Sequence, residues 1–403
     1  MNNPFDEIID RRGTDAIKVD HVKELWGRDD LLPLWIADMD FATPPFVLDA
    51  LRRRLDHPVL GYTCRSQAWT DAITAWQQQR YGWTVSADWL YFVPGIVPGI
   101  AFAIQCFTKP GDKVLIQTPV YHPYIHVPQN NGRMVVMSDL VVREAVPGTV
   151  TPRLEVDWQR FERDVKGCKL FLLCHPHNPG GRVWSVEELQ RMADICAREG
   201  VIVVSDEIHA DLTLSGYHHH PFASVSDTAA QCSITFASPS KAFNIPGLTS
   251  SYSIIPNDAL RERFHAYLGN NELSNGHLFA FQAVVAAYSH GTQWLDDCLG
   301  YIEDNIDYLW QTLHDTMPRI TMMRPEASFL VFLDCRALTH RDGTPLTHDE
   351  LLSFFADGAR LALNDGAMFG TPGTGFMRLN VATPRAILAE ALRRLKEAYD
   401  SLD

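Results

Sequence analysis

The chain contains a series of short apolar and β-branched runs. Runs of this length and composition predict buried β-strands. We therefore expect seven strands, at Tyr91–Val93, Val114–Ile116, Met134–Met137, Leu170–Leu173, Val201–Val204, Ser233–Phe236 and Tyr252–Ile255.

Segments of helical length and period lie between several of these runs. One of them, Ser185 to Glu199, begins with Ser185-x-x-Glu188, the pattern of a capping box, and repeats apolar residues at positions 186, 189, 192, 193 and 196. Strands that alternate with helices indicate a largely parallel sheet. We therefore predict an α/β fold built on a seven-stranded, mostly parallel sheet.

The pattern changes near residue 290. A long amphipathic stretch, Trp294 to Met317, precedes short strands near Phe329–Leu333 and Phe376–Val381. The first 45 residues, with an extended Leu34–Ala37, also fall outside the repeating pattern. We expect two domains: a large α/β domain at 46–289, and a smaller α+β domain formed by 1–45 and 290–403.

Composition narrows the class of protein. The 403 residues carry 35 Lys and Arg against 49 Asp and Glu, a net charge of −14, and 46% of them are hydrophobic. This composition is typical of an ordered globular chain. The acidic balance argues against nucleic-acid or anionic-membrane partners, which attract excess Lys and Arg. A small-molecule partner is favoured.

Cysteine usage and the apolar stretches bear on the compartment. The eight cysteines are scattered and form no C-x-x-C pair, which argues against a disulfide framework or a zinc site. The segment Met1–Asp10 has no apolar core of a secretory signal. Phe92–Phe107 is apolar but too short to span a bilayer. We expect a soluble, cytoplasmic protein.

Lys241 is the first candidate for chemistry. It lies in Ser238-Pro239-Ser240-Lys241, directly after a predicted buried strand. A lysine at such a strand end can lose hydration, which lowers its pKa and lets it act as an amine nucleophile or Schiff-base former. Taken alone, a loop lysine is most often a solvated side chain.

Three further segments strengthen this interpretation. Asp206 ends the predicted Val201 strand, Asn178 lies in a turn after the Leu170 strand, and Gly95 begins a predicted helix after the Tyr91 strand. Carboxyl ends of parallel strands are where open α/β sheets bind ligands, and helix N-termini bind phosphate. Each segment also has an ordinary alternative, as a helix cap or a turn. Together they describe a Schiff-base lysine, a carboxylate for a pyridinium nitrogen, an amide donor and a phosphate site, as pyridoxal 5'-phosphate (PLP) requires.

With these segments together, the chain resembles a known family. It is similar to fold-type I PLP-dependent enzymes of the class I/II aminotransferase group, and within that group to the PatB/MalY-like cystathionine β-lyase (C–S lyase) branch. The resemblance implies the PLP-dependent transferase fold of aspartate aminotransferase. Its motifs cover nearly the whole chain: Asn3–Asp6, Trp35–Phe41, Gly61–Thr63, Tyr81–Trp83, His177–Pro179, Ser205–Asp211, Ser238–Asn244 and Met377–Asn380.

The resemblance implies catalytic roles for three residues. Lys241 corresponds to the lysine that joins the cofactor as a Schiff base and then moves the substrate Cα proton. Asp206 corresponds to the carboxylate that keeps the pyridine nitrogen protonated, and Tyr121 to the aromatic residue that stacks on the ring.

The resemblance also implies binding roles. Asn178 would donate to the phenolic oxygen of the cofactor, with His209 where aminotransferases often carry a second donor, a tyrosine. Arg378 would clamp the substrate carboxylate, a bidentate task that suits a guanidinium. The substrate site would also include Ile36, Ala37 and Asn178, and the phosphate site Gly95, Ile96, Val97, Ser238, Ser240 and, from the other subunit of a homodimer, Tyr62.

The sequence departs from the family pattern in three places. Thr249 stands where many aminotransferases have a phosphate-binding arginine, and the lyase branch commonly lacks that arginine. Val19 replaces the tryptophan of the branch's Lys-Trp-Asp, and Tyr124 stands where phenylalanine is usual. We expect the last two changes to reshape the mouth of the substrate site and to leave the cofactor-binding residues untouched.

The resemblance favours an α,β-eliminating lyase that acts on a sulfur-containing L-amino acid such as cystathionine. An aminotransferase would use the same residues, and a regulatory binding protein could keep the same fold. A scaffold has no chemical need for Lys241, Asp206, Asn178 and Arg378 together, which argues against a purely non-catalytic role. No metal is expected, because the consecutive side chains of His218–His220 point in different directions.

Overall fold

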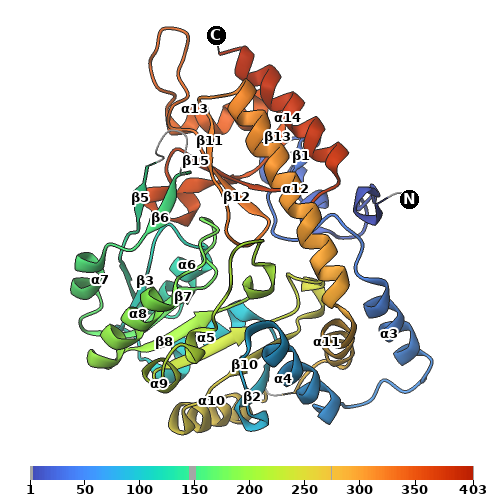
Figure 1. Ribbon diagram of the computed structural model, residues 1–403, viewed down its shortest axis with the longest axis vertical. Coiled ribbons are helices and arrows are strands. Elements are labelled where there is room, and N and C mark those ends of the chain that lie inside the picture. Colours follow the sequence, from blue (N-terminus) through green and yellow to red (C-terminus); the bar gives the residue numbers. More distant parts are fainter. Residues whose placement is uncertain (1–2, 145–150, 274, 403) are drawn as a thin grey trace.

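Two β-sheets organise the chain (Figure 1). The computed structural model describes residues 3–144, 151–273 and 275–402. One sheet has seven strands and the other four, and the described residues also form two separate pairs of short strands.

The seven-stranded sheet has the order β2-β10-β9-β8-β7-β3-β4. Only β10 runs antiparallel to its neighbours, so the predicted mostly parallel sheet is confirmed. All seven predicted strands are present, as β2 (Leu90–Val93), β3 (Lys113–Ile116), β4 (Met134–Met137), β7 (Cys168–Cys174), β8 (Ile202–Asp206), β9 (Ser233–Ala237) and β10 (Ser251–Ile254).

Both faces of this sheet are buried, as expected where helices cover each side. On β7 the side chains alternate: Leu170 and Leu172 pack into one apolar cluster, and Phe171 and Leu173 into another. A run without polar residues is therefore what such a central strand requires.

Helices connect and cover the strands. The predicted capping box begins α8, where the Ser185 hydroxyl accepts from the Glu188 amide and the Glu188 carboxylate accepts from the Ser185 amide. The helices of this part of the chain are α3 (Pro45–Leu55), α4 (Gln67–Tyr81), α5 (Ile96–Phe107), α6 (Pro123–Asn130), α7 (Trp158–Asp164), α8 (Val186–Arg198), α9 (Asp227–Gln231), α10 (Asp258–Asn270) and α11 (Leu278–His290).

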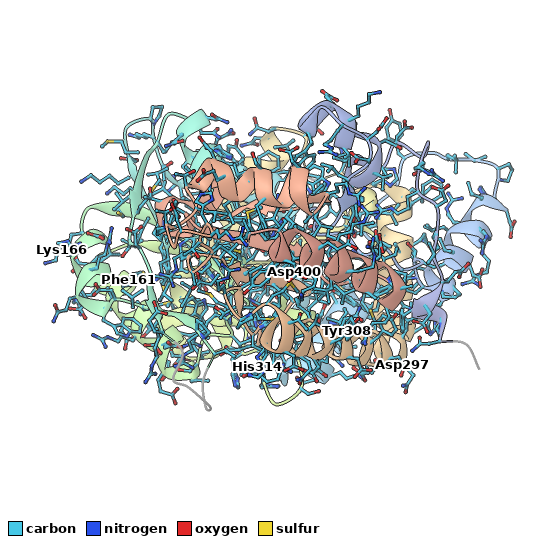
Figure 2. All side chains as sticks on the ribbon, turned by 90° about the horizontal axis from the view of Figure 1, so that it is seen from above. Phe161, Lys166, Asp297, Tyr308, His314 and Asp400 are labelled. Atoms are coloured by element: carbon cyan, nitrogen blue, oxygen red, sulfur yellow. The ribbon has the colours of Figure 1, made fainter. Side chains whose placement is uncertain are left out.

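The second sheet is antiparallel and has the order β11-β12-β15-β14. The predicted long helix is α12, which runs beside this sheet toward α11 (Figure 1). Seen from above, its residues Asp297, Tyr308 and His314 follow one side of the molecule (Figure 2). The elements of this part are α12 (Thr292–Thr316), β11 (Thr321–Met323), β12 (Leu330–Asp334), α13 (His348–Ser353), β13 (Leu361–Ala362), β14 (Asn364–Asp365), β15 (Phe376–Asn380) and α14 (Arg385–Asp400).

The N-terminal segment pairs with the C-terminal part of the chain. It contains α1 (Ile17–Asp20), α2 (Val22–Trp26) and β1 (Leu32–Pro33), and β1 lies parallel to β13. This pairing supports the predicted grouping of the two segments, although the boundaries at 46 and 289 stay a prediction. A separate pair, β5 (Val141–Arg143) with β6 (Arg153–Glu155), is antiparallel. Across the described ranges, none of the helices has the length and apolar character needed to cross a membrane.

The register of the large sheet brings three loops together. Cys174 of β7 pairs with Asp206 of β8, and Asp206 pairs with Phe236 of β9. These strands are parallel, so the residues that follow them emerge at one edge of the sheet. Asn178, Asp206 and Lys241 are therefore neighbours despite their separation in the sequence.

Candidate active site

A cavity of about 270 Å³ opens at this edge of the large sheet. Most of the predicted site residues line it; Ile36, Tyr62, Ser238 and Arg378 do not. Its wall consists of Ala37, Pro94, Gly95, Ile96, Val97, Pro98, Tyr121, Cys174, Asn178, Asp206, Ile208, His209, Ser240, Lys241, Pro246, Thr249, Ser250 and Ser251.

Lys241 projects into this cavity from the loop after β9. Burial lowers the pKa of its ammonium to about 8, and the nearby Arg378 cation acts in the same direction. Its Nζ donates a hydrogen bond to the carbonyl oxygen of Ala37. Desolvation favours the neutral amine, so Lys241 has a larger fraction of the nucleophilic form near neutral pH than an exposed lysine.

Asp206 faces the same cavity from the end of β8. Its side chain is almost completely buried, and burial raises the pKa of its carboxyl to about 6. Two donors oppose this effect: the Ile208 amide lies 3.1 Å from Oδ1 and the Tyr124 hydroxyl 3.0 Å from Oδ2. Asp206 is thus a buried carboxylate with one hydrogen-bond donor at each oxygen, as a partner for a pyridinium nitrogen requires.

Asn178 and Arg378 form one unit beside the cavity. Arg378 Nη1 donates to Asn178 Oδ1 at 2.9 Å, which leaves the amide Nδ2 of Asn178 to donate elsewhere. Arg378 Nη2 donates to the Trp35 carbonyl at 3.1 Å and to the Asn364 side-chain oxygen. The amide nitrogen of Tyr121 donates to the Asn178 carbonyl at 3.0 Å, so the backbone of the predicted stacking residue is fixed to the same unit.

Arg378 is a buried cation whose hydrogen-bond partners, Asn178, Asn364 and the Trp35 carbonyl, are all neutral. Burial lowers the pKa of its guanidinium to about 10, and its Nε has no hydrogen-bond partner. Among the residues the structure describes, no carboxylate forms an ion pair with it. A buried charge of this kind is costly unless it is paired, so the site is suited to an incoming carboxylate.

The start of α5 supplies a second binding feature. Gly95 is the residue before this helix. The first turn of the helix includes Ile96 and Val97, and the backbone amides of that turn have no partners within the helix. Such amides favour anions. The buried Ser250 hydroxyl also lines the cavity and lacks a hydrogen-bond partner.

Two of the predicted binding residues lie behind the cavity wall. The Ser238 hydroxyl donates to the Ser250 carbonyl at 2.7 Å and accepts from the Ser240 amide, so it shapes the loop that carries Lys241. The Ile36 carbonyl accepts from Asn380 Nδ2 at 2.7 Å. Their direct contact with a ligand stays a prediction.

His209 and Tyr62 have contrasting positions. His209 is buried in the cavity wall with its Nδ1 unpartnered, and burial lowers its pKa to about 3, so the imidazole is neutral. Tyr62 is fully exposed between α3 and α4, outside the cavity of its own chain.

The expectation for Tyr124 is wrong. Tyr124 is completely buried and contacts Asp206 directly, so it belongs to the surroundings of the cofactor site instead of the substrate mouth. Val19 lines a different hollow, beside Arg11 and Asp40. Sequence reasoning also missed Ser250, whose position depends on how β10 begins beside the Lys241 loop.

The groups around the cavity fit the predicted cofactor. A lysine with a lowered pKa, a buried carboxylate, an amide donor and the α5 N-terminus surround one space. The unpartnered Ser250 hydroxyl and His209 Nδ1 are further polar atoms that a bound group could satisfy. Asp206, Asn178 and Lys241 would hold its ring and Schiff base, and the α5 turn its phosphate.

Comparison with known proteins agrees with this geometry. The family model "Aminotransferase class I and II" matches residues 29–395. Cystathionine beta-lyase PatB of Bacillus subtilis (strain 168) is 42% identical over 396 residues, which cover 98% of this chain and 99% of that protein. Protein MalY of Escherichia coli (strain K12) is 33% identical over 400 residues, 98% of each chain.

A solved structure is similar over the same extent. The PLP-bound C-S lyase from Staphylococcus hominis has a TM-score of 0.90 and 34% identity, and the match covers 99% of this chain and 98% of that one. The likeness therefore extends over both sheets and the cavity at the edge of the large sheet. The chain belongs to the aminotransferase class I and II family, in its PatB/MalY-like cystathionine β-lyase branch.

Proposed function

We propose that the protein is a PLP-dependent carbon–sulfur lyase of the cystathionine β-lyase type. It would cleave a sulfur-containing L-amino acid to a thiol, pyruvate and ammonia, with one water molecule consumed. The observation that carries this proposal is the single cavity that joins Lys241 to Asp206, beside the unpaired Arg378. The names of PatB and of the Staphylococcus hominis C-S lyase support the choice of reaction.

Each residue has a task that follows from its position. PLP, when bound, supplies an electron sink that stabilises negative charge at the substrate Cα. Arg378 would bind the substrate carboxylate and orient the Cα–H bond toward Lys241. The Lys241 amine would take the Cα proton, because its lowered pKa leaves it neutral in a useful fraction of molecules.

The elimination then follows from the charge at Cα. The Cβ–S bond breaks, its electron pair leaves with the thiolate, and a carbon–carbon double bond forms between Cα and Cβ. The released three-carbon enamine hydrolyses to pyruvate and ammonia. Asp206 supports the step by holding the cofactor's ring nitrogen protonated, an electrostatic contribution that must be in place before the reaction.

We further propose a homodimer in which each subunit completes the other's site. The exposed Tyr62 supports this, because it lies outside its own cavity and next to the exposed apolar Val59 and Leu60. We also propose a cytoplasmic location, supported by the eight free cysteines. Cell fractionation tests the location.

Pyruvate release from L-cystathionine without any keto acid tests the lyase proposal. We expect catalytic release of pyruvate and free thiol from the PLP-loaded protein, and none from Lys241→Ala, because that variant lacks the base. Lys169→Ala, which removes an exposed lysine of β7, is the matched control and should keep its activity. Turnover that begins only when a keto acid is added would show an aminotransferase.

Arg378→Lys should lower kcat/KM for L-cystathionine by about 100-fold or more, because an ammonium cannot replace the bidentate hydrogen bonds of a guanidinium to the substrate carboxylate in a buried site. Steady-state kinetics measure the effect. Arg385→Lys alters an arginine that contacts Asn305 and Tyr308 and should change kcat/KM little. Equal kinetics for Arg378→Lys and the wild type would remove Arg378 from the substrate site.

The rate at which the apoprotein takes up PLP should depend on the ionisation of Lys241. Only the neutral amine attacks the aldehyde, and burial lowers its pKa to about 8. We expect the rate to rise with pH and to level off above about pH 8, because burial lowers the pKa of Lys241 to about 8 and its amine is then mostly neutral. Absorbance of the bound cofactor follows the reaction. A rate that keeps rising through pH 10 would mean that Lys241 behaves as a solvated lysine.

Subunit mixing tests the shared site. Lys241→Ala and Tyr62→Phe should each impair activity alone, whereas a mixed dimer contains one site with both native residues. We therefore expect activity to return when the two variants are dissociated and reassociated together. An active monomer in sedimentation, or no gain on mixing, would contradict the shared site.

A further inference from the structure

Tyr124 lies at a position that links the cofactor site to the core of the large sheet. It is the second residue of α6, and its side chain is completely buried. Its amide donates to the Tyr121 carbonyl at 3.0 Å, and the Tyr121 amide donates to the Asn178 carbonyl at 3.0 Å. Its hydroxyl is therefore held on a backbone that two other site residues share.

The Tyr124 hydroxyl points at Asp206. The distance from this oxygen to Asp206 Oδ2 is 3.0 Å, while the Ile208 amide occupies Oδ1. Burial raises the pKa of the Tyr124 phenol well above its usual value, so the phenol stays protonated and is the donor. The carboxylate is thus held at both oxygens.

We propose that Tyr124 is a positioning residue that keeps Asp206 ionised and correctly turned for the cofactor's ring nitrogen. The inference rests on the proposed cofactor and deepens the role of that site. It concerns a departure from the branch pattern, because the usual phenylalanine has no hydroxyl to donate.

The other groups that face Asp206 make this donor important. Tyr121 and the Cys174 thiol, whose pKa burial raises, are neutral. Glu207 opposes ionisation of Asp206. The Lys241 ammonium favours ionisation of Asp206, but this amine becomes part of the Schiff base when PLP binds. Among the described side chains around Asp206, Tyr124 is then the remaining hydrogen-bond donor.

Loss of the Tyr124 hydroxyl should shift the proton on the cofactor's ring nitrogen toward Asp206. A hydrogen bond to an ionised group changes the balance between its charged and neutral forms by about ten- to a hundred-fold. Without it, the Asp206 carboxylate becomes more basic and competes better for the proton on the ring nitrogen. The ring would then withdraw less charge from Cα, and Lys241 would remove the Cα proton more slowly.

The test is ¹⁵N NMR of the substrate-free holoenzyme loaded with PLP labelled at its ring nitrogen. We expect the wild-type signal at the protonated position between pH 6 and 9, and the Tyr124→Phe signal shifted toward the unprotonated position. The kcat for L-cystathionine should fall about tenfold with little change in KM. A second variant carries 3-fluorotyrosine at residue 124, whose hydroxyl is a stronger hydrogen-bond donor. Its ring-nitrogen signal should stay where the wild-type signal lies.

Tyr252→Phe is the matched control. It removes another fully buried hydroxyl, one that contacts Tyr288 and Gln77 instead of Asp206, and should leave the ring-nitrogen signal unchanged. A wild-type signal in Tyr124→Phe would overturn the inference even if kcat falls, and would leave the proposed function intact. Failure of the wild-type protein to bind PLP would overturn both.

Discussion

The burial of charged groups at one edge of an apolar sheet is the constraint on which this structure depends. Asp206 ends β8 and Lys241 follows β9. The side chains of these two central strands are buried on both faces, so water is scarce around the two charged groups. The same burial raises the pKa of Asp206 to about 6 and lowers that of Lys241 to about 8. Both shifts arise from desolvation of the charged form. The shift in Lys241 leaves more of its amine neutral for proton transfer, whereas the shift in Asp206 is opposed by the donors at its two oxygens.

The N-terminal segment shows how distant parts of the chain support this site. The Ala37 carbonyl accepts from Lys241, and the neighbouring Asp40 carboxylate forms an ion pair at 2.9 Å with the fully buried Lys18. Arg11 pairs with the same carboxylate at 2.9 Å. The segment that closes one side of the cavity is thus fixed by charges outside it. Its contact with the C-terminal part comes from Asn380, whose Nδ2 donates to the Ile36 and Asp38 carbonyls at 2.7 Å each, and from the pairing of β1 with β13.

Sequence reasoning located the parts of the site that depend on strand ends. Lys241, Asp206 and Asn178 each follow an apolar run, and parallel strands bring such residues to one edge. It could not place Tyr124, because the direction of that side chain depends on how α6 packs against the sheet. It could not find Ser250 either, since the position of that residue follows from the antiparallel β10 and not from a motif. Both depend on tertiary packing.

The proposed chemistry requires that Lys241 is the amine that binds the cofactor. Borohydride reduction of the PLP-loaded protein, followed by peptide mass spectrometry, tests it most directly, because reduction makes the link between amine and cofactor permanent. We expect the phosphopyridoxyl group on the peptide that contains Lys241. Its presence on another lysine, or its absence from a protein that retains PLP, would show that Lys241 is not this amine.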